Sequence, residues 1–501
     1  MNAGSTAALR SLHRKHKMLL GQTAINFAAN VFSAVFGLIN VIVFTRLLAP
    51  AEFGTYVLGV GFAQIASTFM ISWLRLPIMR EQARGDGTDV RGVIVPGLVL
   101  SCLLAPVAYI GSPLVGLTSL PASAAAALAL AIGLFETGQE LLRARLQAFT
   151  VMKATMVRAV LVSALGVAFT VVGHSGVLLL TASALAYLMA AFAFTSDAWA
   201  GTVVRFDGAR LSSMAKAGIP LTVSLTLLAL SGVIDRFIIA HLVGSAQAGQ
   251  YSAGVDLVRQ ALIIPAISAA AAFFPLAVQI HANKGAGAVR SHLAECFEFL
   301  LAGTLPASLG FAILSTHLAN VILGADFRST AIAIMPIVSI ACVFQIMAYQ
   351  YLHISFLLSG RNSFYLWNTA SVLAFNAVVS YLLIQHFGSV GAAWGRLAAD
   401  IFGFSGALLL SRWAFPMPTP FRRLTKVLIA SVVMAIVVRS VDLAAAPSDK
   451  VALAVLVPSG VASYLIMCWM LDIAKSRHYL NRGLQIASKA LAQLRLRGMQ
   501  L

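Results

Sequence analysis

Long apolar stretches recur along this chain from about residue 19 to residue 471. A stretch of about 20 apolar residues is long enough to cross the hydrocarbon core of a bilayer as a helix. Inside that core every backbone polar group must be satisfied by the protein itself, so only helices and closed barrels can span it. The sequence therefore predicts an all-α polytopic membrane protein. Composition agrees, because hydrophobic residues make up 59% of the chain and charged residues only 10%.

The apolar stretches predict about fourteen transmembrane helices. They cover roughly residues 19–45, 55–74, 92–112, 119–138, 155–173, 177–196, 214–240, 250–280, 297–316, 329–354, 362–385, 390–411, 425–441 and 451–471. The segments between them are too short for a soluble catalytic domain or a large extracytoplasmic loop. We therefore expect any functional site to be built within the membrane helices.

The distribution of basic residues predicts the orientation. With the N-terminus in the cytoplasm, all but seven of the 35 Lys and Arg residues lie in or next to cytoplasmic segments; the exceptions are Arg46, Arg236, Arg259, Arg328, Arg396, Arg439 and Lys450. The positive-inside rule requires this asymmetry, so we expect an even number of spans and two cytoplasmic termini. Anionic lipid headgroups then account for the net charge of +18, and no nucleic-acid partner is needed.

A short motif occurs twice, 195 residues apart. Residues 45–59 read TRLLAPAEFGTYVLG and residues 240–254 read AHLVGSAQAGQYSAG; the shared pairs are Leu47 and Leu242, Ala51 and Ala246, Gly54 and Gly249, Tyr56 and Tyr251, and Gly59 and Gly254. Each copy ends one apolar stretch and begins the next. Because six crossings return a chain to the same side of the membrane, the motif predicts two six-helix repeats of parallel topology.

These patterns predict the following organisation: a basic cytoplasmic N-terminus at 1–18, an N-lobe of spans 1–6 at 19–197, a cytoplasmic linker at 198–213, a C-lobe of spans 7–12 at 214–411, two extra C-terminal helices (spans 13–14) at 412–471, and a basic tail at 472–501. In the tail, the apolar residues recur at helical spacing, which is typical of an amphipathic helix on the inner membrane surface. A partner-binding helix is the alternative.

Motifs of common enzyme classes do not occur in the sequence. There is no GxxxxGK[ST], HExxH, CxxC or GxSxG pattern, so the chain lacks the residues for nucleotide hydrolysis, zinc-dependent proteolysis or serine hydrolysis. The four cysteines are far apart, which favours neither a disulfide framework nor a metal site. We therefore expect a protein that is not an enzyme and has no cofactor or metal.

Ionisable residues within spans are the candidate site. They are Asp235 and Arg236 in span 7, Asp256 and Arg259 in span 8, and Arg396 and Asp400 in span 12. A buried lone charge costs at least a few kcal/mol and usually faces an aqueous cavity. One interpretation is structural salt bridges. The other is a polar cavity in which the arginines bind an anionic headgroup, since a guanidinium offers paired donors to a pyrophosphate, while the three acids are candidates for ion coupling.

Further polar residues in the spans have two interpretations. Asn26 and Asn30 in span 1, like Asn368 and Asn376 in span 11, could contact sugar hydroxyls or make interhelical hydrogen bonds. Charged residues at the inner end of span 4 could form a cytoplasmic gate or a solvated helix end; they are Glu136, Glu140, Arg143 and Arg145.

Several segments resemble a known family. They are the end of span 1 with TRLLAP and EFGTY, IPLTVSLTLLALSGVIDRFIIAHLVGSAQAGQYSAG at 219–254, LLSGRNS at 357–363 and GSVGAAWGR at 388–396. Over nearly its whole length the chain resembles polysaccharide flippases of the multidrug/oligosaccharidyl-lipid/polysaccharide exporter superfamily, and fourteen spans suit the O-antigen and exopolysaccharide branch.

The resemblance implies two six-helix lobes around a central cavity. It also implies translocation of an undecaprenyl-diphosphate-linked oligosaccharide from the inner to the outer leaflet of the bacterial inner membrane, with polysaccharide polymerase and co-polymerase proteins as partners. A cation-coupled multidrug exporter of the same superfamily and a lipid II flippase are the alternatives. A glycan polymerase would need a large extracytoplasmic loop, and a membrane scaffold would leave the repeat and the buried charges unexplained. The sequence identifies neither the glycan nor the coupling ion.

Overall fold

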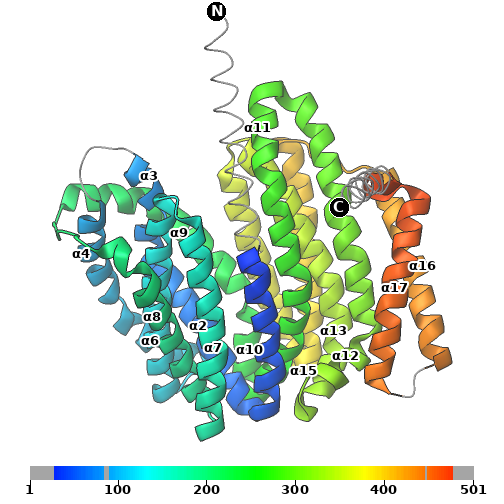
Figure 1. Cartoon of the computed structure of the whole chain (residues 1–501), viewed down its shortest axis with the longest axis horizontal. Coiled ribbons are helices and arrows are strands. Elements are labelled where there is room, and N and C mark those ends of the chain that lie inside the picture. Colours follow the sequence, from blue (N-terminus) through cyan, green and yellow to red (C-terminus); the bar gives the residue numbers. More distant parts are fainter. Residues whose placement is uncertain (1–27, 84–89, 446–447, 478–501) are drawn as a thin grey trace, which may run out of the picture.

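The computed structural model describes residues 28–83, 90–445 and 448–477, and within these ranges the chain forms helices and no strand (Figure 1). The predicted N-terminal segment 1–18, Asn26 and most of the predicted tail lie outside the described residues. Local sequence signals mark several helix starts. Pro50 lies in the first turn of α2, where its missing N–H costs nothing, and the Asp207 side chain accepts a hydrogen bond from Arg210 N at the start of α9.

The first half of the chain contains the Ala28–Leu47 helix, α2 (Pro50–Arg75), α3 (Ile78–Ala83), α4 (Val90–Cys102), α5 (Ala105–Gly111), the 3₁₀ turn η1 (Ser112–Val115), α6 (Ser119–Ala144), α7 (Ala148–Gly173) and α8 (Gly176–Trp199).

The second half contains α9 (Gly208–Ser231), α10 (Ile234–Leu242), α11 (Ser245–Ile313), α12 (Ser315–Ile322), α13 (Ala325–Ile346), the π-helical segment η2 (Met347–Leu352), α14 (Ile354–Leu358), α15 (Asn362–Ala414), α16 (Phe421–Ala445), α17 (Asp449–Leu471) and the 3₁₀ turn η3 (Ile473–Lys475).

Eleven helices in the described ranges are long and apolar enough to cross a membrane. Two of them, α11 and α15, each contain two spans that turn back at Gly285 (φ 77°) and Gly388 (φ 56°). Glycine adopts these positive φ angles without steric cost. A further predicted span, 92–112, is broken into α4 and α5. The prediction of about fourteen transmembrane helices in an all-α protein is therefore confirmed.

The helices form two lobes side by side, with an appended pair at one edge (Figure 1). In the N-terminal lobe, α2, α6 and α8 pack around Met70, Leu128 and Leu180. In the C-terminal lobe, α11, α13 and α15 pack together, and α16 and α17 lie against the later part of α11. The domain boundaries at 197, 213 and 411 stay predictions.

The two lobes share one apolar core. It joins Phe44 and Phe53 of the N-terminal lobe to Tyr251 and Phe327 of the C-terminal lobe. In addition, α9 runs along α2, where the backbone of Gly218 lies against that of Trp73. Lipid tails are as apolar as leucine, so close van der Waals packing rather than the hydrophobic effect holds such helices together. The small residues at these contacts allow that close approach.

Candidate functional site

A break in one helix organises the candidate site. α9 ends at Ser231, and α10 begins at Ile234 after a turn at Gly232 and Val233. A helix that ends inside a membrane leaves backbone carbonyls without intrahelical donors, and these must be satisfied by neighbouring groups. Arginines supply the donors here. Arg396 donates from Nη1 to the Ser231 carbonyl at 2.6 Å, and Arg259 donates from Nη1 to the Gly232 carbonyl at 2.9 Å.

Asp235, in the first turn of α10, is enclosed by polar groups from α15. Its Oδ1 accepts hydrogen bonds from Asn376 Nδ2 at 2.8 Å and from Ser380 Oγ at 3.2 Å. Its other oxygen lies 3.8 Å from Arg396 Nη1. Arg396 in turn pairs through Nε with Asp400 at 2.9 Å, one helical turn further along α15. The Asp235 carboxylate, 4% exposed, and the Asp400 carboxylate, 3% exposed, thus share one guanidinium.

The remaining charges are arranged differently. Asp256 of α11 pairs with Arg236 of α10, and not with Arg259 one turn away on its own helix. Among the described residues no ion pair joins Arg259 to a carboxylate; its contact is the Gly232 carbonyl. Since α11 begins at Ser245, Arg259 lies about 21 Å along its helix. This is deeper than its position in the predicted span.

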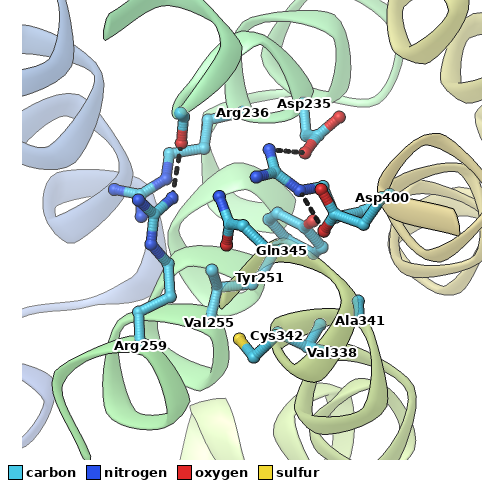
Figure 2. Close-up of a pocket in the computed structure, with 12 residues that line it drawn as sticks. Asp235, Arg236, Tyr251, Val255, Arg259, Val338, Ala341, Cys342, Gln345 and Asp400 are labelled. Atoms are coloured by element: carbon cyan, nitrogen blue, oxygen red, sulfur yellow. Dashed lines mark hydrogen bonds and ion pairs between the residues drawn. The ribbon is translucent and has the colours of Figure 1, made fainter. Parts of the chain in front are cut away.

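Five of the six charged residues, all but Asp256, line one small pocket (Figure 2). Arg236 and Arg259 lie on one side of it, and Asp235 and Asp400 on the other. Its volume is about 20 Å³, roughly the room of one water molecule. A diphosphate therefore fits only if the surrounding helices move apart. Three guanidinium groups line the pocket against two carboxylates, so its lining favours an anion.

The structure brings together all six predicted charged residues, from three spans. Asn376 joins them through Asp235. Asn368 does not; it contacts His353 and the Gly403 carbonyl. Asn30 is exposed on the Ala28–Leu47 helix, and the structure shows no contact of its side chain with the pocket within the described ranges.

Sequence reasoning missed three contributors to the site. Ser380 follows Asn376 by four residues, a spacing that places both on one helix face and could have identified it. Tyr251 lies in the repeated motif and lines the pocket. The carbonyls of Ser231 and Gly232 carry no signal in an apolar pattern.

The charged residues at the end of α6 tie the N-terminal lobe together. Glu136 pairs with Arg75 of α2, Glu140 pairs with Arg143 at 2.9 Å, and Arg145 donates to the Ala198 carbonyl of α8 at 3.1 Å. These partners belong to the same lobe. The contacts support the interpretation as a polar helix end rather than a gate between lobes.

The described ranges contain no group of three or more His, Cys, Asp or Glu residues that could hold a metal ion. All four cysteines are free, and three of them are buried. The polar side chains that line the pocket carry guanidinium, carboxylate and amide groups, together with the Tyr251 hydroxyl and the Cys342 thiol.

Solved structures with the same fold are membrane transporters. The chain resembles a lipid II flippase, MurJ, in an inward closed conformation (TM-score 0.75, 14% identity, covering 89% of this chain and 98% of that one). It also resembles a mutant of the Vibrio cholerae MATE transporter VcmN (0.57, 17%, 79% and 96%) and an inward-facing multidrug resistance MATE family transporter of the MOP superfamily (0.55, 15%, 78% and 94%). At these identities the likeness shows the fold alone.

No curated protein matches the sequence. The model of a family described as polysaccharide biosynthesis protein matches residues 19–281, more than half of the chain. This range begins before the first described helix and includes α10 and the part of α11 that carries Asp256 and Arg259. The chain therefore belongs to the polysaccharide biosynthesis protein family.

Proposed function

We propose that this protein is a flippase that moves an undecaprenyl-diphosphate-linked oligosaccharide from the inner to the outer leaflet of the bacterial inner membrane for cell-surface polysaccharide biosynthesis. Its family membership and its transporter fold support this proposal. The two lobes would open the pocket alternately to the two sides of the membrane. The polar headgroup would pass between the lobes while the polyprenyl tail stays in lipid.

The observation that carries the proposal is the absence of a carboxylate partner for Arg259 among the described residues. Its guanidinium lies at the pocket and meets a backbone carbonyl but no carboxylate among the described residues. An arginine that served only to neutralise a buried acid would pair with that acid, as Arg396 does with Asp400. A guanidinium with free donors suits a diphosphate because it can make two parallel hydrogen bonds.

The remaining charges take graded roles in this proposal. Arg236 is the second candidate to bind the diphosphate, because it lies on the same side of the pocket as Arg259. In this role it would give up its ion pair with Asp256 and bind the diphosphate instead. The Asp256 side chain is 25% exposed, so it is the most accessible of the three candidate coupling acids. Arg396 donates through Nε and Nη1 to groups of its own lobe, so we assign it a positioning role.

The alternatives differ in the ligand that they require. A lipid II flippase would use the same diphosphate chemistry with another headgroup, and MurJ, whose fold this chain shares, is such a protein. An arginine-rich pocket would repel the cationic substrates of a multidrug exporter, so it disfavours that alternative. Polymerase and co-polymerase proteins, as partners that receive the glycan, belong to the proposal as well.

Substitution of Arg259 tests the proposal. We expect Arg259→Ala to reduce translocation of an undecaprenyl-diphosphate-linked oligosaccharide in proteoliposomes at least tenfold, a loss typical of one charge-assisted contact. Arg259→Lys should restore part of the rate, since an ammonium cannot provide the paired donors. The measurement is the fraction of glycan that a soluble lectin can reach in the outer leaflet.

Arg412→Ala is the matched control, because Arg412 is exposed at the end of α15, away from the pocket. It should translocate at the parent rate. Lipid II and a cationic dye serve as competing substrates. If the parent protein transported either of these and not the oligosaccharide, the proposed substrate would be wrong. If Arg259→Ala translocated the oligosaccharide at the parent rate, Arg259 would not be a substrate-binding residue.

A further inference from the structure

The two copies of the repeated motif touch each other in the structure. Gly54 of α2 lies against the Ser245 carbonyl of α11, and Gly249 of α11 lies against the Pro50 carbonyl of α2. Gly54 corresponds to Gly249 in the repeat, and Pro50 corresponds to Ser245 at the same spacing of 195 residues. Each contact is therefore the counterpart of the other, and α2 and α11 cross on a local two-fold axis between the lobes.

Two further contacts join the lobes beside this crossing. Gly324, just before α13, lies against the Thr45 carbonyl at the end of the first helix. A methyl group on Gly116, shortly before α6, would lie 3.8 Å from Ala240 Cβ at the end of α10. Thr45 and Ala240 again occupy equivalent positions in the repeat. The lobes are thus joined at this end of the molecule by contacts in addition to the glycine crossing.

The crossing lies next to the charged pocket. Tyr251, two residues after Gly249, is 2% exposed and lines the pocket. Val255 lines it as well, about 9 Å beyond Gly249 along α11. Phe53 and Phe327 close the seam with an edge-to-face contact at 5.4 Å between ring centroids. On this side, apolar packing separates the pocket from the end of the molecule.

We infer that the crossing of α2 and α11 at Gly54 and Gly249 is the outer gate of the transport path, closed in this structure, and that the lobes part there when the pocket opens outward. The inference rests on the proposed alternating access and on the predicted orientation. At the crossing itself the two helices meet through glycines and backbone carbonyls, a close approach that small residues allow. The side chains around it, such as Phe53 and Phe327, must part when the gate opens.

Steric reasoning makes the gate testable. A methyl group at position 54 would overlap the Ser245 carbonyl, and one at position 249 would overlap the Pro50 carbonyl. Backbone atoms cannot move aside as a flexible side chain can. An alanine at either position therefore disfavours the closed gate and leaves a state with parted lobes unhindered, which shifts the population toward that state.

The experiment measures access to the pocket from outside. In a background without the four native cysteines, Val255→Cys, a position 7% exposed in the closed state, is labelled with a membrane-impermeant maleimide applied to the outer face of intact cells. We expect Gly54→Ala and Gly249→Ala each to speed labelling about tenfold or more, as overpacking of a tight contact implies. Phe327→Leu should act in the same direction, because it weakens the seam without a clash.

Two matched glycine variants control for packing in general. Gly303→Ala in α11 meets open space, and Gly391→Ala overlaps the Leu383 carbonyl within the C-terminal lobe. Both should label at the parent rate, although the second should lower the yield of protein. If Gly54→Ala does not accumulate in the membrane, the labelling rate of Phe327→Leu tests the gate in its place.

Parent-rate labelling of folded Gly54→Ala, Gly249→Ala and Phe327→Leu would overturn the gate. Because labelling needs no substrate, the substrate proposal can fail separately. Faster labelling of the gate variants, together with a parent protein that does not translocate the oligosaccharide, would support the gate and reject the substrate.

Discussion

Arg259 and Arg396 line the same pocket, but their surroundings differ. Arg396 is 8% exposed and donates to Asp400 and to the Ser231 carbonyl. Arg259 donates to the Gly232 carbonyl. In a low-dielectric interior, removal of one partner of a buried ion pair leaves the other charge uncompensated, whereas loss of one hydrogen bond to a carbonyl costs much less. The same substitution should therefore affect folding at one position and transport at the other.

We expect Arg396→Ala to destabilise the protein by roughly 3–5 kcal/mol, since it leaves Asp235 and Asp400 without their shared cation. Thermal unfolding of purified protein in detergent measures this as a lower Tm. The double variant Arg396→Gln with Asp400→Asn should recover part of the loss, because it removes the nearer of the two acids together with the cation. Arg259→Ala is the comparison and should unfold near the parent temperature. A parent-like Tm for Arg396→Ala would contradict the structural role given to this ion pair.

The sequence named six charged residues that the structure brings together, but it did not predict how they pair. Asp256 and Arg259 are three residues apart on one helix, which favours a local pair. In the structure Asp256 pairs instead with Arg236 from α10. The difference arises because α9 and α10 are separated by a break that places Arg236 beside α11 and exposes a carbonyl to Arg259. An apolar pattern shows the length of a span, but it does not show where the helix within that span is interrupted.

At the level of elements, α16 and α17 are attached to the rest of the protein by a polar cluster on α12. His317 contacts Asp449 of α17 through Nδ1 at 2.7 Å and Asp442 of α16 through Nε2 at 2.9 Å. Asn320 donates to Asp449 at 3.1 Å, and Arg439 pairs with Asp442 at 3.1 Å. His317 lies outside the candidate spans. Burial alone would lower its pKa, but the two carboxylates outweigh burial and raise the pKa above the ordinary 6.5.

This cluster predicts that the attachment of α16 and α17 depends on pH. A histidine whose pKa is raised by folding contributes stability that is complete below about pH 6.5 and is lost as pH rises through its folded-state pKa. We expect hydrogen exchange at the start of α17 and the end of α16 to quicken over that interval, after correction for the intrinsic pH dependence of exchange. His317→Gln keeps a polar side chain without the charge and should remove the dependence. Equal pH profiles for both proteins would contradict the prediction.

The broken helices show where element prediction from the sequence stopped. Spans 92–112 and 214–240 each appeared as one apolar stretch, yet the structure divides them into α4 with α5 and α9 with α10. The turns at these breaks consist of apolar or small residues, such as Leu103 and Leu104 or Gly232 and Val233. A hydropathy pattern therefore does not distinguish them from the helices on either side. The hairpin turns within α11 and α15, in contrast, contain the glycines that such turns need.

At the scale of the whole molecule, the repeated motif was the most informative part of the sequence. It predicted two related halves, and the structure brings the two copies of the motif into contact at Gly54 and Gly249. Five shared residue pairs could not predict that contact, because a repeat gives the relation of the halves but not the axis between them. The side of the membrane on which the crossing lies still depends on the charge distribution alone.

The structure groups the helix ends, so that a few reporter fusions can fix the orientation. His174, between α7 and α8, lies 3.2 Å through Nδ1 from the Leu47 carbonyl beside the crossing, so both belong to one end of the molecule. Gly360 belongs to the other end of its lobe, where Arg361 Nη1 donates to the Trp413 carbonyl at the close of α15. The positive-inside rule places the first end outside.

We therefore expect alkaline phosphatase to be active when fused after Gly111, His174 or His386, and green fluorescent protein to be fluorescent when fused after Asp207 or Gly360. Each reporter fused at the opposite set of positions is the internal control, because alkaline phosphatase and green fluorescent protein become active on opposite sides of the membrane. A wholly reversed pattern would leave the fold intact but place the Gly54–Gly249 crossing on the cytoplasmic side. A reversal only at His386 would contradict the second half of the repeat. The turn at Gly388 would then lie on the cytoplasmic side, whereas two lobes related by an axis along the membrane normal require it on the outer side.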